Sequence, residues 1–285
     1  MQDILKHLQV HIPFDQLVQK YLDKVLRESI NPEIAFNCAI LERFSDGDYD
    51  RIAKVLREAG RSVTFHAPFM DLRPGAIDPK IRQVSLERFR RVFEVASRFS
   101  PRAIVFHPSY DEKYYVSSGK KWLENSVETW AQLVPLAERL GTRIALENVY
   151  ETDPEYMGRL LEALPPGRVG FCFDTGHFNA FAEAPLDTWI GALEHRIVEI
   201  HLHDNQGTHD EHLPVGDGNF PFEKLFRLLK EKNLRPILTV EAHSERNLAR
   251  TLSNIEALGL LDGFADPCGA EGQPLPTAQS VPGRP

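Results

Sequence analysis

The sequence predicts an α/β protein, a single-domain (β/α)8 TIM barrel. Eight short runs rich in Val, Ile and Phe alternate with eight amphipathic stretches of helical spacing. The runs are apolar enough for strands that helices cover on both faces, as in a parallel sheet. With 285 residues, 42% of them hydrophobic, the chain suffices for one closed barrel of about 250 residues. An open doubly wound sheet is the alternative, but no GxGxxG turn follows the first run.

The strands and helices are expected to alternate along the chain. The strands are predicted at residues 8–14, 33–37, 62–68, 103–108, 143–148, 169–175, 197–204 and 237–242. The helices are predicted at residues 14–29, 49–59, 79–99, 120–140, 154–164, 186–195, 222–233 and 245–258. After Gly263 the chain is rich in Pro, Gly and small polar residues and shows no periodicity. We therefore expect a catalytic barrel over residues 1–263 and a disordered C-terminal tail over residues 264–285.

Composition narrows the class of protein. Three widely spaced cysteines, Cys38, Cys172 and Cys268, form neither a disulfide framework nor a CxxC zinc pattern. A net charge of -8 argues against nucleic acid as a partner, because affinity for nucleic acid depends on Lys and Arg. With no signal segment and no long apolar run in view, we expect a cytoplasmic protein without a membrane partner. The oligomeric state is left open.

Ionisable residues follow six consecutive predicted strands, from the third to the eighth. In a TIM barrel the ends of these strands meet at one mouth, where the chemistry takes place. A single Asp at a strand end is usually a helix cap, and a single His usually bonds a carbonyl group. Nine such groups at one mouth would repel and lose solvation unless a cation compensated them. The predicted metal ligands are His66, His107, Glu147, Asp174, His177, His201, Asp210, His212 and Glu241.

The donor types indicate which metals fit. Imidazole and carboxylate without thiolate suit zinc, manganese or iron better than calcium or magnesium. Because one ion rarely takes more than six ligands, nine candidates predict two or three ions. Such centres usually activate water and hold the oxygens of a phosphate. His203 alternates with His201, so one ring is expected to face the barrel interior and the other the helices. We assign the ligand role to His201 and a supporting or packing role to His203.

The motifs that carry these residues resemble a known family. In order they read FHAPF, VFHP, LEN, FDTGH, IHLHDN, DEHLPVGDGNF and VEA. This series is similar to the xylose isomerase-like TIM barrel superfamily, and within it to the endonuclease IV branch. The resemblance implies three zinc ions. The first would bind His66, His107 and Glu147; the second Glu147, Asp174, His201 and Glu241; and the third His177, Asp210 and His212.

The same resemblance implies hydrolysis of a phosphoester or phosphodiester by metal-activated water. Glu147, Asp210 and Glu241 are the expected catalytic carboxylates. Phe69 stands where DNA-cutting relatives have Tyr, so a small phosphorylated substrate is expected instead of DNA. Stretches such as FHAPFMDLRPGAIDP resemble a side branch, the cobamide-remodelling phosphodiesterases, which act on the nucleotide loop of corrinoids. Arg73, in a loop at the mouth, is interpreted as solvated surface.

Two alternatives stay open. Sugar and sugar-phosphate isomerases and epimerases of this superfamily use one divalent ion held by two Glu, one Asp and one His. Glu147, Asp174, His201 and Glu241 match that set equally well. The epimerases also have an Arg after the seventh strand that grips substrate oxygens, whereas this chain has NQGTHDEH there. The second alternative is a metal-containing sensor or binding barrel without turnover.

Overall fold

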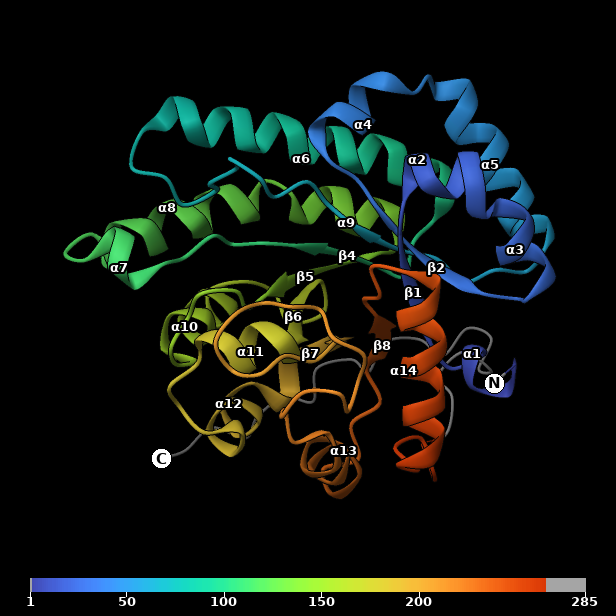
Figure 1. The fold of residues 1–285 in the computed structure, drawn as a ribbon. Coiled ribbons are helices and arrows are strands. Elements are labelled where there is room, and N and C mark those ends of the chain that lie inside the picture. Colours follow the sequence, from blue (N-terminus) through green and yellow to red (C-terminus); the bar gives the residue numbers. More distant parts are fainter. Residues whose placement is uncertain (1, 265–285) are drawn as a thin grey trace, which may run out of the picture.

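The chain folds into a closed barrel of eight parallel strands, as Figure 1 shows for the computed structural model. The structure describes residues 2–264, so the predicted tail lies outside the described residues apart from Phe264. The strands are β1 Gln9–Pro13, β2 Asn31–Ala35, β3 Thr64–His66, β4 Ala103–Phe106, β5 Arg143–Glu147, β6 Val169–Asp174, β7 Ile197–Leu202 and β8 Ile237–Val240. They are arranged in sequence order, and all eight predicted strands are confirmed.

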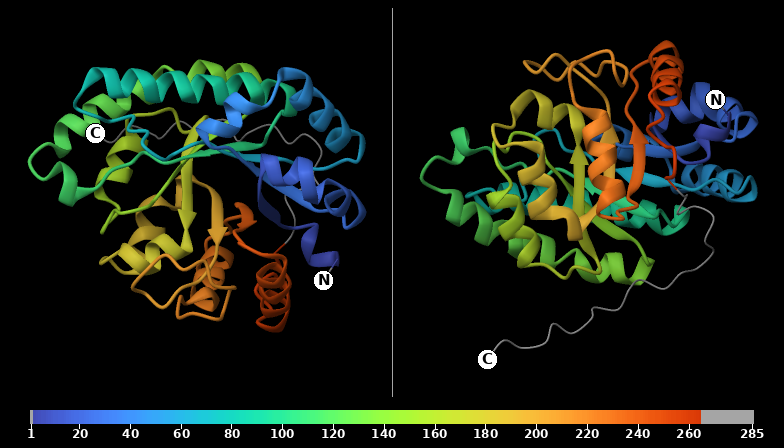
Figure 2. Two further views of the ribbon diagram at one scale, coloured as in Figure 1. Left: turned by 45° about the horizontal axis from the view of Figure 1, so that its top comes forward. Right: turned by 90° about the horizontal axis from the view of Figure 1, so that it is seen from below.

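Helices surround the strands on the outside of the barrel (Figures 1 and 2). They are α1 Gln2–Leu5, α2 Phe14–Gln16, α3 Leu22–Arg27, α4 Cys38–Arg43, α5 Asp46–Glu58, α6 Pro79–Phe99, α7 Glu112–Tyr115, α8 Gly119–Ala131, α9 Val134–Leu140, α10 Glu155–Glu162, α11 Thr175–Phe181, α12 Leu186–Leu193, α13 Phe222–Glu231 and α14 Glu245–Ala257. A π-helical turn, Leu17–Tyr21, joins α2 to α3, and a 3-10 turn, Glu194–Arg196, precedes β7. The helix expected over residues 120–140 is interrupted between α8 and α9, ahead of Pro135. No helix in residues 2–264 combines the length and the apolar character needed to cross a membrane.

The side chains inside the barrel change character along its axis. Small apolar residues such as Val105, Ala145 and Cys172 form one buried cluster. Two positions further along the same strands, Ala145 is followed by Glu147 and Cys172 by Asp174. Because strand side chains alternate between faces, residues two apart share a face. The barrel thus has a small apolar floor and presents carboxylates towards its carboxyl-end mouth.

Fewer residues pair between β1 and β8, where the barrel closes, than between β1 and β2. Only Gln9 and Val10 pair with β8, whereas five residues of β1 pair with β2. Beyond this short ladder, His11 Nδ1 lies 3.2 Å from Glu241 Oε1. Side chains therefore join β1 to β8 at the mouth, where the backbone ladder has ended.

Candidate metal centre

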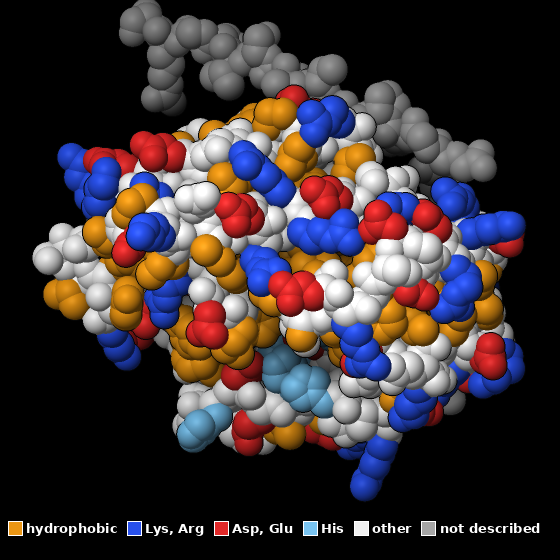
Figure 3. Space-filling view, turned by 90° about the horizontal axis from the view of Figure 1, so that it is seen from above, with side chains coloured by type: hydrophobic (Ala, Val, Ile, Leu, Met, Phe, Trp, Pro, Cys, Tyr) orange, Lys and Arg blue, Asp and Glu red, His pale blue; other side chains and the backbone are white. Residues whose placement is uncertain are grey.

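The nine predicted residues come together at the mouth of the barrel. Seven of them line a cavity of about 460 Å³, and Asp174 and His201 lie fully buried next to it. On the face drawn in Figure 3, histidine side chains gather at one place on the surface, beside acidic and apolar side chains. His11, on β1, and His243, which follows β8, also line the cavity. The fold thus places donors from six strands around a single space.

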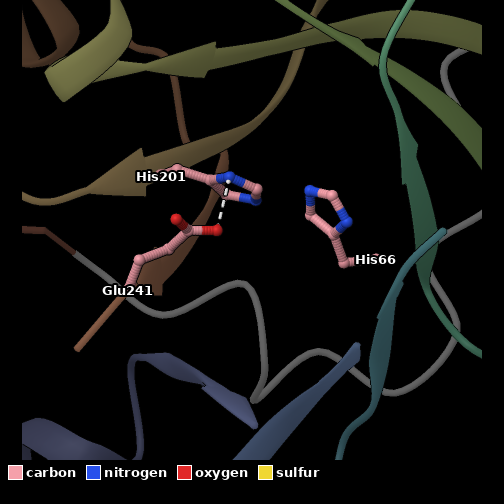
Figure 4. Close-up of side chains that lie close together, drawn as sticks. All are labelled: His66, His201 and Glu241. Carbon is pink, nitrogen blue, oxygen red and sulfur yellow. Dashed lines mark ion pairs between the residues drawn. The ribbon is translucent and has the colours of Figure 1, made fainter. Parts of the chain in front are cut away.

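His201 lies at the centre of four of these residues. Its Nδ1 is 3.2 Å from Glu241 Oε1, 3.6 Å from Glu147 Oε2 and 3.7 Å from Asp174 Oδ2. Figure 4 shows the ring facing Glu241, with His66 on the far side of the space. Donors that bind one ion at about 2.0 to 2.2 Å lie about 3 to 4 Å from one another. Because Nδ1 is buried and has no hydrogen-bond partner, this donor set fits a divalent ion.

A second group surrounds Glu147. His66 Nε2 and His107 Nε2 each lie 3.2 Å from Glu147 Oε2. His66 Nδ1 lies 3.0 Å from the carbonyl oxygen of Ala67, which can only accept a hydrogen bond. In the neutral ring the hydrogen is therefore on Nδ1, and Nε2 turns its lone pair towards the carboxylate. Burial lowers the pKa of His107, which favours the neutral form that binds metal.

A third group joins the turn after β6 to the loop after β7. His177 Nε2 lies 3.4 Å and His212 Nε2 3.0 Å from Asp210 Oδ2. His177 Nδ1 is held 3.0 Å from the carbonyl oxygen of Asn148, so this ring also turns its other nitrogen to a carboxylate. Asp210 Oδ1 and His212 Nδ1 are buried without hydrogen-bond partners. All three groups that the resemblance implies are thus assembled.

The imidazoles and carboxylates at the mouth shift each other's pKa values. Burial lowers the pKa of His177, but Asp174, Asp210 and Glu147 oppose it, so the pKa is well above its usual value. Burial raises the pKa of Asp210, but hydrogen bonds from His177 and His212 reverse the effect and lower it. His177 and Asp210 therefore favour each other's charged forms. A bound metal ion would take the place of a proton on the imidazole.

Glu33 is a site residue that sequence reasoning missed. It lies on β2, is fully buried, and places Oε2 3.3 Å from His201 Nε2 and Oε1 2.9 Å from His11 Nδ1. A carboxylate at Nε2 favours the tautomer with hydrogen on that nitrogen, which leaves Nδ1 as the free donor. Burial raises the pKa of Glu33, but His201 and His11 lower it to about 2, so the carboxylate is charged. A Glu at the start of the predicted strand at 33–37 was the available signal.

The prediction that His201 and His203 face opposite sides is wrong. Residues two apart in a strand share a face, so His203, which directly follows β7, lies on the same side as His201, and its Nε2 is 2.9 Å from both oxygens of Asp174. The ring occupies the space beside Gly176, where an added Cβ would lie 2.0 Å from His203 Cε1. The supporting role assigned to His203 is consistent with this contact. Asp174 also caps α11, because its Oδ1 accepts a hydrogen bond from the His177 N–H.

The loop that carries Asp210 and His212 is anchored at Asp204. The Asp204 carboxylate accepts hydrogen bonds from the backbone N–H groups of Gly216, Gly218 and Phe220 at 2.9 to 3.0 Å. An added Cβ at Gly218 would lie 2.4 Å from Asp204 Oδ1, so the close approach needs glycine there. The glycines of LPVGDG therefore serve this anchor.

Comparison with known proteins identifies the family. The family model described as xylose isomerase-like TIM barrel matches residues 32–261. The chain belongs to this family. The predicted superfamily and fold are therefore confirmed, and the family is one of enzymes.

Curated relatives include an uncharacterized protein of Methanocaldococcus jannaschii, which is 29% identical over 66% of this chain and 67% of its own length. An inosose dehydratase of Clostridium botulinum is 27% identical over 51% of this chain and 54% of its own length. Among solved structures, a D-tagatose 3-epimerase-like protein has a TM-score of 0.77 at 23% identity, covering 90% of this chain and 98% of its own. The IOLI protein, solved with a binding zinc atom, has a TM-score of 0.73 at 18% identity, and the match covers 90% of this chain and 99% of that protein's chain. The two structures establish similarity of fold.

Proposed function

We propose that this member of the xylose isomerase-like family is a divalent-metal isomerase or epimerase of a sugar or sugar phosphate. The observation that carries the proposal is the unpartnered Nδ1 of His201 among Glu147, Asp174 and Glu241. These four residues match the one-ion set expected of such enzymes. The name of the epimerase-like structure supports this reaction class better than the predicted phosphoester hydrolysis, and the inosose dehydratase is likewise not named as a hydrolase.

The four residues would divide the chemistry between them. An ion held there would supply Lewis acidity that polarises a carbonyl or hydroxyl oxygen of the substrate. Glu241 borders the cavity and lies 3.2 Å from His11 Nδ1, so its carboxylate is placed to accept a substrate proton. Glu33 holds His201 with Nδ1 directed into the site. Glu147 is held by three further imidazoles, which favours a structural role for it over proton transfer.

Phosphoester hydrolysis with two or three ions is the second candidate, and one observation favours it. Three atoms of predicted ligands outside the set of four, His107 Nε2, Asp210 Oδ1 and His212 Nδ1, are also buried without hydrogen-bond partners. A one-ion isomerase does not require the groups around His66 and Asp210. The loop after β7 also lacks the Arg expected of epimerases. Within this candidate, a cobamide substrate stays a prediction from resemblance.

Metal content and turnover separate the two candidates. We would measure bound metal per chain in the purified protein and in His66→Ala, His212→Ala and His201→Ala. The isomerase predicts one ion per chain, which is lost only in His201→Ala. It also predicts that the enzyme exchanges a C–H hydrogen of its substrate for deuterium, which NMR would detect in a panel of ketoses. The hydrolase predicts two or three ions per chain and fewer in His66→Ala and His212→Ala. It also predicts cleavage of bis(p-nitrophenyl) phosphate or cobamides. These results together would reject the isomerase. Tight binding without product would instead indicate a sensor.

A further inference from the structure

The cavity at the mouth has two chemically different sides. His11 on β1, with Asp210, His212, Glu241 and His243 on the segments after β7 and β8, lines one side. The other side has His66, His107 and Glu147 at the ends of β3, β4 and β5, and the loops that follow these strands add Phe69, Met70, Leu72, Val149 and Tyr150, together with the polar Asp71, Arg73, Ser109 and Asp111. A ligand that fills the space would meet ion-binding groups at the strand ends and apolar side chains on the loops after β3 and β5.

The apolar side is exposed to an unusual degree. In the part of the chain that is described, Phe69 is 42%, Met70 68% and Tyr150 52% exposed. Large apolar side chains that remain together at the edge of a cavity usually mark a binding surface. Because these three residues border the candidate metal centre, the substrate of that centre is the occupant that they would meet.

The aromatic rings on this side are held in place. Phe69 is stacked on the ring of His107, with centroids 4.4 Å apart and an angle of 20° between the planes, and it meets His66 edge-on at 5.6 Å. Tyr150 packs edge-on against Phe181 at 5.2 Å. One face of Phe69 is therefore covered by an imidazole of the centre, and its remaining exposure is towards the open space. A ring fixed in this way loses little conformational freedom when a ligand stacks on it.

Arg73 is the one Lys or Arg side chain among the lining residues, and it does not extend into solvent alone. Its guanidinium lies 4.3 Å from the ring centroid of Tyr114, which is 63% exposed. The interpretation of Arg73 as plain solvated surface is thus incomplete. Arg73 is therefore held against an aromatic ring where it lines the cavity.

We propose that the substrate carries a flat, apolar or aromatic ring joined to the oxygen-rich group on which the metal centre acts, and that Phe69 and Tyr150 bind this ring. The inference rests on the proposed function only in taking the mouth as a metal-dependent catalytic site, and it holds for either reaction class. The volume of about 460 Å³ lies within the roughly 300 to 1,000 Å³ of pockets that bind drug-sized ligands. A bare triose or inorganic phosphate would leave the aromatic side uncovered.

Two matched ligand pairs test the proposal by binding, without turnover. Phenyl phosphate and methyl phosphate form one pair, and phenyl and methyl glucoside form the other. Each would be titrated into the zinc-loaded full chain by calorimetry. We expect the phenyl member of at least one pair to bind about tenfold or more tightly than its methyl partner. In Phe69→Ala/Tyr150→Ala this preference is expected to fall to about one, with the affinity for the methyl member unchanged.

Leu258→Ala is the control, because Leu258 is as exposed as Phe69 but follows α14 at its C-terminal end, away from the cavity. Zinc content is measured for every variant. Because loss of Phe69 could disturb His107, the single variant Tyr150→Ala is tested as well, since it leaves Phe69 in place. Three results would overturn the proposal: equal affinities of the phenyl and methyl members in both pairs, no binding of any of the four ligands, or a phenyl preference that survives in the double variant. A double variant that changes the oligomeric mass but keeps the preference would assign the surface to a second copy and also overturn it. Failure of the reaction assays with an intact phenyl preference would reject the proposed reaction alone.

Discussion

Single histidines at the mouth are oriented by what binds their outer nitrogen. His66 and His177 each place one ring nitrogen against a backbone carbonyl, and His201 places one against Glu33. In each ring the other nitrogen then turns towards a carboxylate. The orientation thus comes from groups outside the donor set, which a list of strand-end residues does not contain.

Replacement of Glu33 tests this point. In Glu33→Gln the side chain keeps its size but loses the charge that favours hydrogen on His201 Nε2. We expect zinc affinity to fall about 10- to 100-fold, as for other partners of metal-binding histidines, with the fold retained. Competition with a chromophoric chelator measures the affinity. Glu151→Gln is the control, since Glu151 is also buried but accepts a hydrogen bond from the Val149 backbone N–H; an equal loss in both variants would contradict the role of Glu33.

Gly176 gives a second prediction at the level of one residue. A Cβ there would lie 2.0 Å from His203 Cε1, so Gly176→Ala must displace the ring that holds Asp174. We expect a loss of about 1 to 3 kcal/mol in unfolding free energy, together with weaker zinc binding. Chemical denaturation measures the first effect. Gly191→Ala, on the exposed face of α12 with nothing within 4 Å of the added Cβ, should be neutral or stabilising by up to about 1 kcal/mol.

Whole segments position the site as well. The loop between β7 and α13 contains no helix or strand of its own, apart from the bridge between Asp204 and Leu213, and its shape depends on the Asp204 carboxylate. Three backbone N–H groups converge on this side chain. A loop anchored at its base can present Asp210 and His212 to His177 in a fixed arrangement.

Asp204→Ala should release this loop. Of the three N–H groups, that of Phe220 is buried, and a buried N–H group left without its acceptor costs about 1 to 3 kcal/mol, so we expect destabilisation and faster amide exchange over residues 205–220. Hydrogen exchange with mass spectrometry reads both the location and the extent. Asp187→Ala removes only an exposed ion pair with Lys224 and is expected to change stability by less than about 1 kcal/mol. Unchanged exchange in the loop of Asp204→Ala would refute the anchor.

Across the whole molecule, alternation of strands and helices predicted the barrel because each strand had to be apolar on both faces. That the nine residues meet at one mouth was predictable, because barrel topology brings strand ends together whatever the intervening sequence. The side taken by His203 was predictable too, because residues two apart in a strand share a face, and the prediction misapplied that rule. Glu33 was not predicted because it lies within β2 and not at a strand end. The sequence also did not decide the reaction class, because the four residues of the one-ion set are contained in the nine residues of the three-ion set. The cytoplasmic location stays a prediction.

Removal of metal should act on the whole fold, because the donors come from strands around the barrel. An ion that binds only the native state stabilises it by about 2.7 kcal/mol at a hundredfold excess over its dissociation constant. In a domain somewhat smaller than this one, each kcal/mol shifts the melting temperature by roughly 2 to 4 °C. We expect dialysis against EDTA to lower the melting temperature by several degrees, and zinc or manganese to restore it. In His201→Ala the restoration should be weaker, because the central donor is lost. If the chain melted at the same temperature with and without metal, the carboxylates would have to be balanced by protonated imidazoles alone, and the candidate centre would not be a metal site.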